Sequence, residues 1–220
     1  MFLGSDALAL APLTRRICYL EEGDWAEVSR GGATIHDETD AVVERKVRET
    51  ELSGALIGKG NFRHFMQKEI FEQPAVVGDT LQSFVNAVAR SVHMPDLPFD
   101  FAQVPRVTIV ACGTASYAGF VAKYWLEQVA RIPVEFDIAS EFRYREGGVA
   151  LFVSQSGETA DTLAALRYCR SQAQHIVSVV NVGESSIARE SDVVLPTLAG
   201  PEIGVASTKA FTTQLTVLAC

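Results

Sequence analysis

The segment Ser154-Gln155-Ser156-Gly157-Glu158-Thr159 contains the residue types that bind a phosphate group. It has three hydroxyl side chains, one amide and one glycine, and it lies between an apolar run typical of a strand and a run typical of a helix. Free amides at a helix N-terminus, hydroxyl donors and a glycine that permits close approach can hold a dianion without a lysine. Helix capping explains one such hydroxyl residue, but not three. The segment therefore predicts a phosphate site.

Two further polar segments also begin predicted helices. Gly113-Thr114-Ala115-Ser116 follows an apolar strand, and Val205-Ala206-Ser207-Thr208-Lys209 leads into the last helix. Each could be an ordinary helix start, and Lys209 could either meet a substrate oxygen or lie in solvent. Ligands of open parallel sheets bind outside the carboxyl ends of the strands. We therefore expect the three segments to gather at one edge of a sheet around a phosphorylated small molecule.

Other patterns that carry chemistry are missing from the sequence. It has no G-x-x-x-x-G-K-[ST] and no G-x-G-x-x-G nucleotide loop. No Ser-His-Asp arrangement is apparent, and His64 is interpreted as a polar helix residue. The four cysteines form no C-x-x-C pair and have no histidine at zinc-ligand spacing: Cys18, Cys112, Cys169 and Cys220. We therefore expect reduced thiols, no metal and no cofactor.

Composition limits the class of protein. The chain has 220 residues, of which 48% are hydrophobic and 21% charged, which excludes wholesale disorder. Its formal net charge is −8, so it lacks the electrostatic footprint of a nucleic-acid binder. No apolar run reaches the roughly 18 residues of a membrane span, and no basic region precedes the first apolar stretch. These features predict a cytoplasmic protein that contacts neither nucleic acid nor membrane.

The elements that would position these segments alternate between strand and helix after residue 105. Continuous apolar runs predict parallel strands, and the polar-flanked amphipathic runs between them predict helices. The result is an α/β fold with a doubly wound, five-stranded parallel sheet covered by helices on both faces. The predicted strands are 106–112, 133–139, 149–154, 175–182 and 193–197, and the predicted helices are 113–130, 157–171, 185–192 and 205–220.

The first part of the chain has a different pattern of apolar and polar residues. Residues 8–48 predict antiparallel hairpins, one over 17–28 that turns at Glu22-Gly23-Asp24 and one over 31–47 that turns at 37–40. An isolated pair of hairpins leaves an apolar face exposed. After an irregular stretch over 53–62, a helix is expected to stop at Pro74, a second helix over 80–92 to be capped by Asp79, and a loop to cover 93–105.

Several of these segments together resemble a known family. ACGTAS (111–116), ASEFRYR (139–145), SQSGETADTLAALR (154–167), NVGESSIARESD (181–192) and AGPEIGVASTKAFTTQL (199–215) resemble the first SIS (sugar isomerase) domain of the isomerizing glutamine–fructose-6-phosphate aminotransferases. Residues 4–28 are similar to the end of that family's glutaminase domain, and residues 62–70 to its interdomain connector. The resemblance covers essentially the whole chain. It implies a glutaminase remnant over 1–48, a connector over 49–75 and the first SIS domain over 76–220.

The resemblance also implies a function. Enzymes of this family hydrolyse glutamine and pass the ammonia to a two-SIS-domain unit, which converts fructose 6-phosphate to glucosamine 6-phosphate and is a homodimer. Ala115 stands where a serine is common, so it is left out of the implied polar contacts. The implied sugar-phosphate contacts are Cys112, Gly113, Thr114, Ser154, Gln155, Ser156, Thr159, Val205 and Ser207.

No catalytic residue is expected in this chain. In the family the glutaminase nucleophile is an N-terminal cysteine directly after the initiator methionine, whereas Phe2 follows Met1 here. The second SIS domain, which carries the family's general base, ring-opening histidine and Schiff-base lysine, has no counterpart in the sequence. We therefore expect an internal fragment that binds sugar phosphate weakly and does not synthesise glucosamine 6-phosphate.

Two other interpretations remain open. SIS domains also occur in sugar-phosphate-sensing regulators and in sugar-phosphate isomerases or deaminases that have no glutaminase domain. A regulator is expected to carry a helical DNA-binding domain. Residues 1–60 are instead interpreted as hairpins similar to glutaminase sequence, which disfavours both alternatives.

Overall fold

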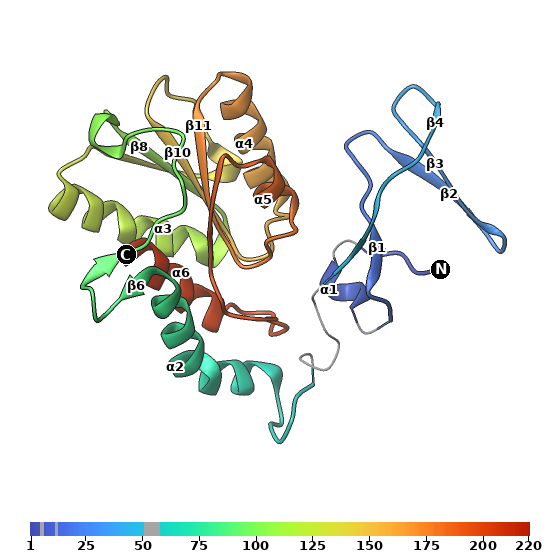
Figure 1. Ribbon diagram of the computed structural model, residues 1–220, viewed down its shortest axis with the longest axis horizontal. Coiled ribbons are helices and arrows are strands. Elements are labelled where there is room, and N and C mark those ends of the chain that lie inside the picture. The colour runs from blue at the N-terminus through green and yellow to red at the C-terminus, as the bar shows by residue number, and fades with distance from the viewer. Residues whose placement is uncertain (5–6, 12, 51–57) are drawn as a thin grey trace. The chain divides into compact units, whose positions relative to one another are not determined.

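The computed structural model describes residues 1–4, 7–11, 13–50 and 58–220. These residues belong to two compact units, Met1–Gly58 and Lys59–Cys220 (Figure 1). Of the predicted irregular stretch 53–62, residues 53–57 lie outside the described residues. Within the described ranges, no helix combines the length and the hydropathy needed to cross a membrane.

Five parallel strands form the sheet of the second unit. They are β8 (Val107–Ala111), β9 (Val134–Ile138), β10 (Val149–Ser154), β11 (His175–Val180) and β12 (Val193–Pro196). Their order is β12-β11-β10-β8-β9, and every neighbouring pair is parallel. All residues of β8 and β10 are buried, which is why their sequences are apolar apart from Thr108 and Ser154 and do not alternate between apolar and polar residues. The predicted α/β class and five-stranded parallel sheet are confirmed.

Helices cover both faces of this sheet (Figure 1). On one face lie α3 (Gly113–Trp125), extended by a π-helical turn over Leu126–Ala130, and α6 (Lys209–Ala219). On the other lie α4 (Ala160–Ser171) and α5 (Ser186–Glu190).

Alternate side chains of each strand pack against opposite helix layers. Ile109 and Val153 belong to the buried cluster that contains Val217 of α6, whereas Val110 and Phe152 belong to the cluster that contains Leu166 of α4. Each fully buried aliphatic or phenyl side chain contributes about 1.5–3 kcal/mol. Short 3₁₀ turns at Phe101–Gln103 and Ala139–Glu141 interrupt the connections.

The helix α2 (Phe65–Phe84) runs through Pro74, so the predicted stop at Pro74 is wrong. The predicted helix over 80–92 with Asp79 as N-cap is also wrong, because α2 ends at Phe84 and a hairpin of β6 (Val85–Asn86) and β7 (Ser91–Val92) follows. An interior proline costs a helix about 3 kcal/mol. Packing against α6 offsets this cost, as does the hydroxyl of Thr80, which accepts a hydrogen bond from the Leu198 amide at 3.0 Å.

The first unit contains two small antiparallel sheets. β1 (Arg16–Cys18) pairs with β5 (Val47–Glu49), while β2 (Trp25–Ser29), β3 (Gly32–His36) and β4 (Val42–Val43) form the other sheet. A short helix, α1 (Ala7–Leu10), precedes them, so the prediction of hairpins from residue 8 onward is wrong at residues 8–10.

Antiparallel hairpins and the turn over 37–40 are confirmed, but the predicted hairpin over 17–28 is wrong. The strands on either side of Glu22-Gly23-Asp24 belong to different sheets, because the Asp24 carboxylate binds Arg45 with two hydrogen bonds of 2.8 Å. These hydrogen bonds lower the pKa of Asp24 to about 2. Apolar side chains in this unit are exposed as predicted, among them Trp25, Val28 and Val42.

Replacing Pro74 by alanine should raise the free energy of unfolding by about 1–3 kcal/mol, because alanine restores a backbone donor inside a continuous helix. Urea denaturation followed by circular dichroism measures the change. Gly78→Ala is the matched control, since it lies in the same helix with open space around it, and it should add about 0.5–1 kcal/mol. A loss of stability for Pro74→Ala alone would mean that the helix is interrupted there.

Candidate ligand-binding site

A cavity of about 340 Å³ lies at the carboxyl ends of β8 and β10. β8 leads through α3 to β9 on one side of the sheet order, and β10 leads through α4 to β11 on the other. The chain therefore diverges between two adjacent strands, and this topological switch point is where open α/β sheets form ligand crevices. All nine predicted site residues line the cavity, namely Cys112, Gly113, Thr114, Ser154, Gln155, Ser156, Thr159, Val205 and Ser207.

The hydroxyl groups of the 154–159 segment fix its own conformation. The Ser154 side chain is almost fully buried, its Oγ accepts from the Gly157 amide at 3.0 Å, and it lies 3.2 Å from Thr159 Oγ1. Ser156 Oγ accepts from the Glu158 amide at 3.2 Å. The N-cap residue of α4 is Thr159, whose side chain makes no capping hydrogen bond. The three hydroxyl residues are therefore not explained as helix caps.

Gly157 is required where the segment turns. Its φ is +67°, in the left-handed region, and an added Cβ would overlap the side chain of Ser185. The Ile187 amide donates to the Gly157 carbonyl at 3.0 Å, and the Ser186 amide donates to the Glu158 carboxylate at 2.7 Å. These bonds attach the segment to the start of α5. They also explain why α4 begins at Ala160, three residues later than predicted.

The second predicted segment begins α3. Cys112 has extended backbone at the N-cap position, and Gly113 has a φ of +56°. Ser116 donates its hydroxyl hydrogen to the Gly113 carbonyl at 2.6 Å, so this hydroxyl supports the turn. Thr114 and Cys112 are half-buried at the cavity wall. The N-termini of α3 and α4, the positive ends of two helix dipoles, therefore begin at the same cavity.

The third predicted segment, 205–209, is helical only at Lys209, and residues 203–208 (hereafter segment 203–208) are not helical. α6 begins at Lys209 and not at Val205, because the carboxylate of Glu202 occupies the helix start. Its Oε2 accepts from the amides of Thr208 at 3.1 Å and Ala210 at 2.9 Å. The Val205 side chain is fully exposed at the rim, and Ser207 is half-buried.

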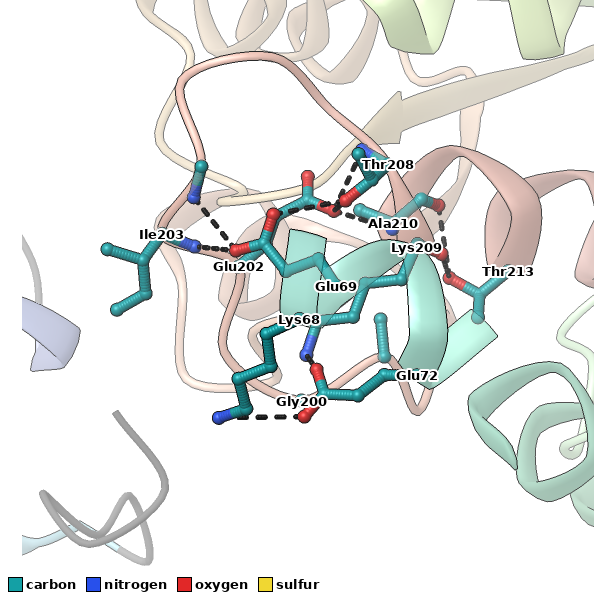
Figure 2. A network of polar contacts seen from close by, with 12 residues as sticks. Lys68, Glu69, Glu72, Gly200, Glu202, Ile203, Thr208, Lys209, Ala210 and Thr213 are labelled. Atoms are coloured by element: carbon teal, nitrogen blue, oxygen red, sulfur yellow. Dashed lines mark hydrogen bonds and ion pairs between the residues drawn. The ribbon is translucent and has the colours of Figure 1, made fainter. Parts of the chain in front are cut away.

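Lys209 neither meets the cavity nor lies in solvent, so both predicted roles are wrong. Its side chain is 5% exposed and its Nζ lies 2.7 Å from Glu72 Oε2 of α2 (Figure 2). Buried charges persist in proteins when they are paired. The prediction failed because Glu72 is 137 residues away in the sequence, and no local pattern indicates the pair.

The cavity has a distinctive charge balance. Its lining residues include no lysine, arginine or histidine, and the one carboxylate among them is Glu202. Backbone amides, hydroxyls and helix dipoles must therefore supply the attraction for an anion. Among the described residues, no group of three or more His, Cys, Asp or Glu side chains is placed to hold a metal ion.

Sequence reasoning missed part of the lining. The additional residues are Ala115, Val153, Glu202, Gly204 and Gln214. An acidic residue shortly before a helix is a signal that could have identified Glu202. Gln214 lies inside α6, where nothing in the local sequence distinguishes a residue that faces the cavity from one in the core.

Comparison with known proteins adds three findings. The family model described as SIS domain matches residues 100–220. Glutamine–fructose-6-phosphate aminotransferase [isomerizing] of Zymomonas mobilis is 63% identical over 223 residues, which are 99% of this chain and 37% of the relative. The protein of the same name from Brucella abortus is 60% identical over 224 residues, covering 100% of this chain and 37% of the relative. The chain thus spans just over a third of the length of these relatives.

A solved structure matches most of the chain. The C-terminal domain of glucosamine-fructose-6-phosphate aminotransferase from Francisella tularensis has a TM-score of 0.65 and 44% sequence identity. The match covers 74% of this chain and 48% of that one.

Gly157→Ala should lower the free energy of unfolding by about 2–4 kcal/mol, because it adds left-handed strain and a clash with Ser185. Chemical denaturation measures the loss. Gly183→Ala is the control, since an added Cβ there meets open space, and it should change stability by less than about 0.5 kcal/mol. Equal effects of the two substitutions would show that the 154–159 segment does not have this fixed shape.

Proposed function

The chain belongs to the SIS-domain family, and from that membership we propose that it is the part of a glutamine–fructose-6-phosphate aminotransferase that holds the sugar phosphate. One observation carries the proposal. Three hydroxyl side chains and two helix N-termini converge on one cavity at the switch point of the sheet. The names and identities of the longer relatives support fructose 6-phosphate and glucosamine 6-phosphate as the ligands.

The phosphate is assigned to the 154–159 segment. The dianion would lie against the hydroxyls of Ser154, Ser156 and Thr159, which the segment's internal hydrogen bonds already hold in place. Preorganised donors cost no reorganisation when the ligand binds. The sugar would extend toward Thr114 and Ser207, the hydroxyl residues of the other two segments.

The acid–base steps of amination and isomerisation are assigned to residues outside this chain. The titratable side chains that line the cavity are Cys112 and Glu202, and Glu202 is engaged with the start of α6. General acid–base catalysis needs a group within hydrogen-bond reach of the reacting atoms. The longer relatives have the additional length to supply such groups.

The same proposal assigns the rest of the chain. Residues 1–48 are the end of a glutaminase domain, 49–75 the connector and 76–220 the first SIS domain. The proposal also assigns the protein to a homodimer and to the cytoplasm. The four cysteines are free thiols, which is compatible with a reducing compartment.

Ser156→Ala should weaken fructose 6-phosphate binding by about 1–2 kcal/mol, because one donor to the phosphate is lost. Isothermal titration calorimetry on the 220-residue chain measures the change. Ser171→Ala is the matched control, since Ser171 is exposed at the last turn of α4, where its hydroxyl donates to the Tyr168 carbonyl and accepts from the side-chain Nε2 of Gln172. Identical affinities for the wild type and Ser156→Ala would contradict the phosphate assignment.

Bound fructose 6-phosphate should slow alkylation of Cys112 by iodoacetamide at least about tenfold at saturation, because the thiol lines the cavity. Mass spectrometry of peptides resolves the four cysteines. Cys18 is exposed outside the cavity, so its labelling rate should not change. Burial raises the pKa of Cys169 to about 11, so that thiol should stay unlabelled at neutral pH. A Cys112 rate unaffected by the sugar phosphate would place the ligand elsewhere.

A further inference from the structure

We propose that Glu69 of α2 is a positioning residue that holds segment 203–208 at the cavity, and thereby sets affinity for the sugar part of the ligand. The proposal rests on the proposed function for the identity of the ligand. Its structural part, that one carboxylate fixes this segment, stands on contacts within the second unit (Figure 2).

The Glu69 carboxylate binds both ends of the segment. Its Oε1 accepts from the amides of Ile203 at 2.6 Å and Gly204 at 2.8 Å. Its Oε2 accepts from the hydroxyl of Thr208 at 3.1 Å. Val205 and Ser207, which line the cavity, lie between these attachment points. The side chain of Glu69 therefore closes a short loop whose middle faces the ligand.

The free-energy cost of burying the Glu69 carboxylate indicates that this residue has a specific role in positioning the segment. Glu69 is 1% exposed, and removing a carboxylate from water costs several kcal/mol unless donors compensate. Donors do compensate here, because the carboxylate accepts three hydrogen bonds, and an apolar side chain in its place would leave those donors without this acceptor. The three donors come from segment 203–208 itself, so the carboxylate gives that segment one defined conformation.

Gly204 provides an independent observation. A Cβ added there would lie 2.5 Å from Glu69 Oε2 and 3.3 Å from its Cδ. The backbone at Gly204 therefore lies so close to the Glu69 carboxylate that only glycine, which has no Cβ, fits at this position without a shift of the carboxylate. Displacing the carboxylate would break its hydrogen bonds, because it is buried and bonded on both oxygens.

A neighbouring carboxylate completes the attachment. The Thr208 hydroxyl lies 3.1 Å from Glu69 Oε2 and 3.2 Å from Glu202 Oε2. A hydroxyl has one proton, so it donates to one carboxylate at a time. Glu202 also caps α6, so the segment is fixed to α2 by Glu69 and to α6 by Glu202. A segment ordered by contacts within the protein has a lower ordering cost when it binds a ligand.

The test compares Glu69→Ala with Glu69→Gln. Alanine removes the acceptor of both amides, whereas glutamine keeps one oxygen for them and can donate its NH₂ to Thr208 Oγ1. Hydrogen exchange should quicken by about tenfold or more over 203–208 in the alanine variant and remain unchanged over 154–159. Fructose 6-phosphate affinity should fall by about tenfold or more, while the glutamine variant stays within about threefold of the wild type.

Inorganic phosphate separates positioning from general destabilisation. It uses only the 154–159 segment, so its affinity should stay within about twofold of the wild type in Glu69→Ala. Glu190→Ala is a control that breaks the ion pair with Arg167 between α5 and α4, away from segment 203–208. It should lower stability without changing exchange over 203–208. If Glu69→Ala does not fold, Gly204→Ala should give the same local exchange change by displacing the carboxylate.

Two results would overturn the proposal. One is unchanged exchange over 203–208 in Glu69→Ala and Gly204→Ala. The other is an equal loss of fructose 6-phosphate and inorganic phosphate affinity, which would mean a general structural role. If the wild-type chain binds no fructose 6-phosphate, the proposed function fails, and the exchange comparison alone still decides whether Glu69 holds the segment.

Discussion

The adjacency of β8 and β10, with their connections leaving in opposite directions, is the constraint on which the rest of the structure depends. It opens a crevice at the carboxyl ends of two fully buried strands and directs the N-termini of α3 and α4 into it. Both strands contribute apolar side chains to the buried clusters on both faces of the sheet, so their position is set by the core. The polar residues that follow them are thereby held in place by packing that they do not themselves provide.

The cavity combines a polar, uncharged anion site with one carboxylate, that of Glu202. No basic side chain lines it, and the 154–159 segment offers amides and hydroxyls that its own hydrogen bonds preorganise. Glu202 also lines the cavity, and the buried Glu69 is bonded to the segment 203–208. A ligand with one anionic end and one polar, uncharged end matches this distribution of charge. A sugar monophosphate is such a ligand.

Local sequence predicted the parts of the fold that depend on local physics. The continuous apolar runs predicted the five strands, and the glycine of the Ser-Gln-Ser-Gly segment, which was expected to permit close approach, has a positive φ. The failures depend on distant partners. Pro74 is tolerated because α6 and residue 198 pack on α2, and Lys209 is buried because Glu72 pairs with it. The hairpin over 17–28 is replaced because Arg45 binds Asp24. None of these partners lies within 20 residues of the residue it affects.

Amide chemical shifts during a titration with fructose 6-phosphate would show where the ligand lies on the chain. The account predicts that the shifts concentrate at residues 112–115, 154–160 and 203–208, around the cavity between β8 and β10. A second cavity, of about 580 Å³, lies at the amino ends of β10 and β11. Its lining residues include Tyr144, Gly147 and His175. Shifts centred on that cavity, or no saturable shifts at all, would contradict the account.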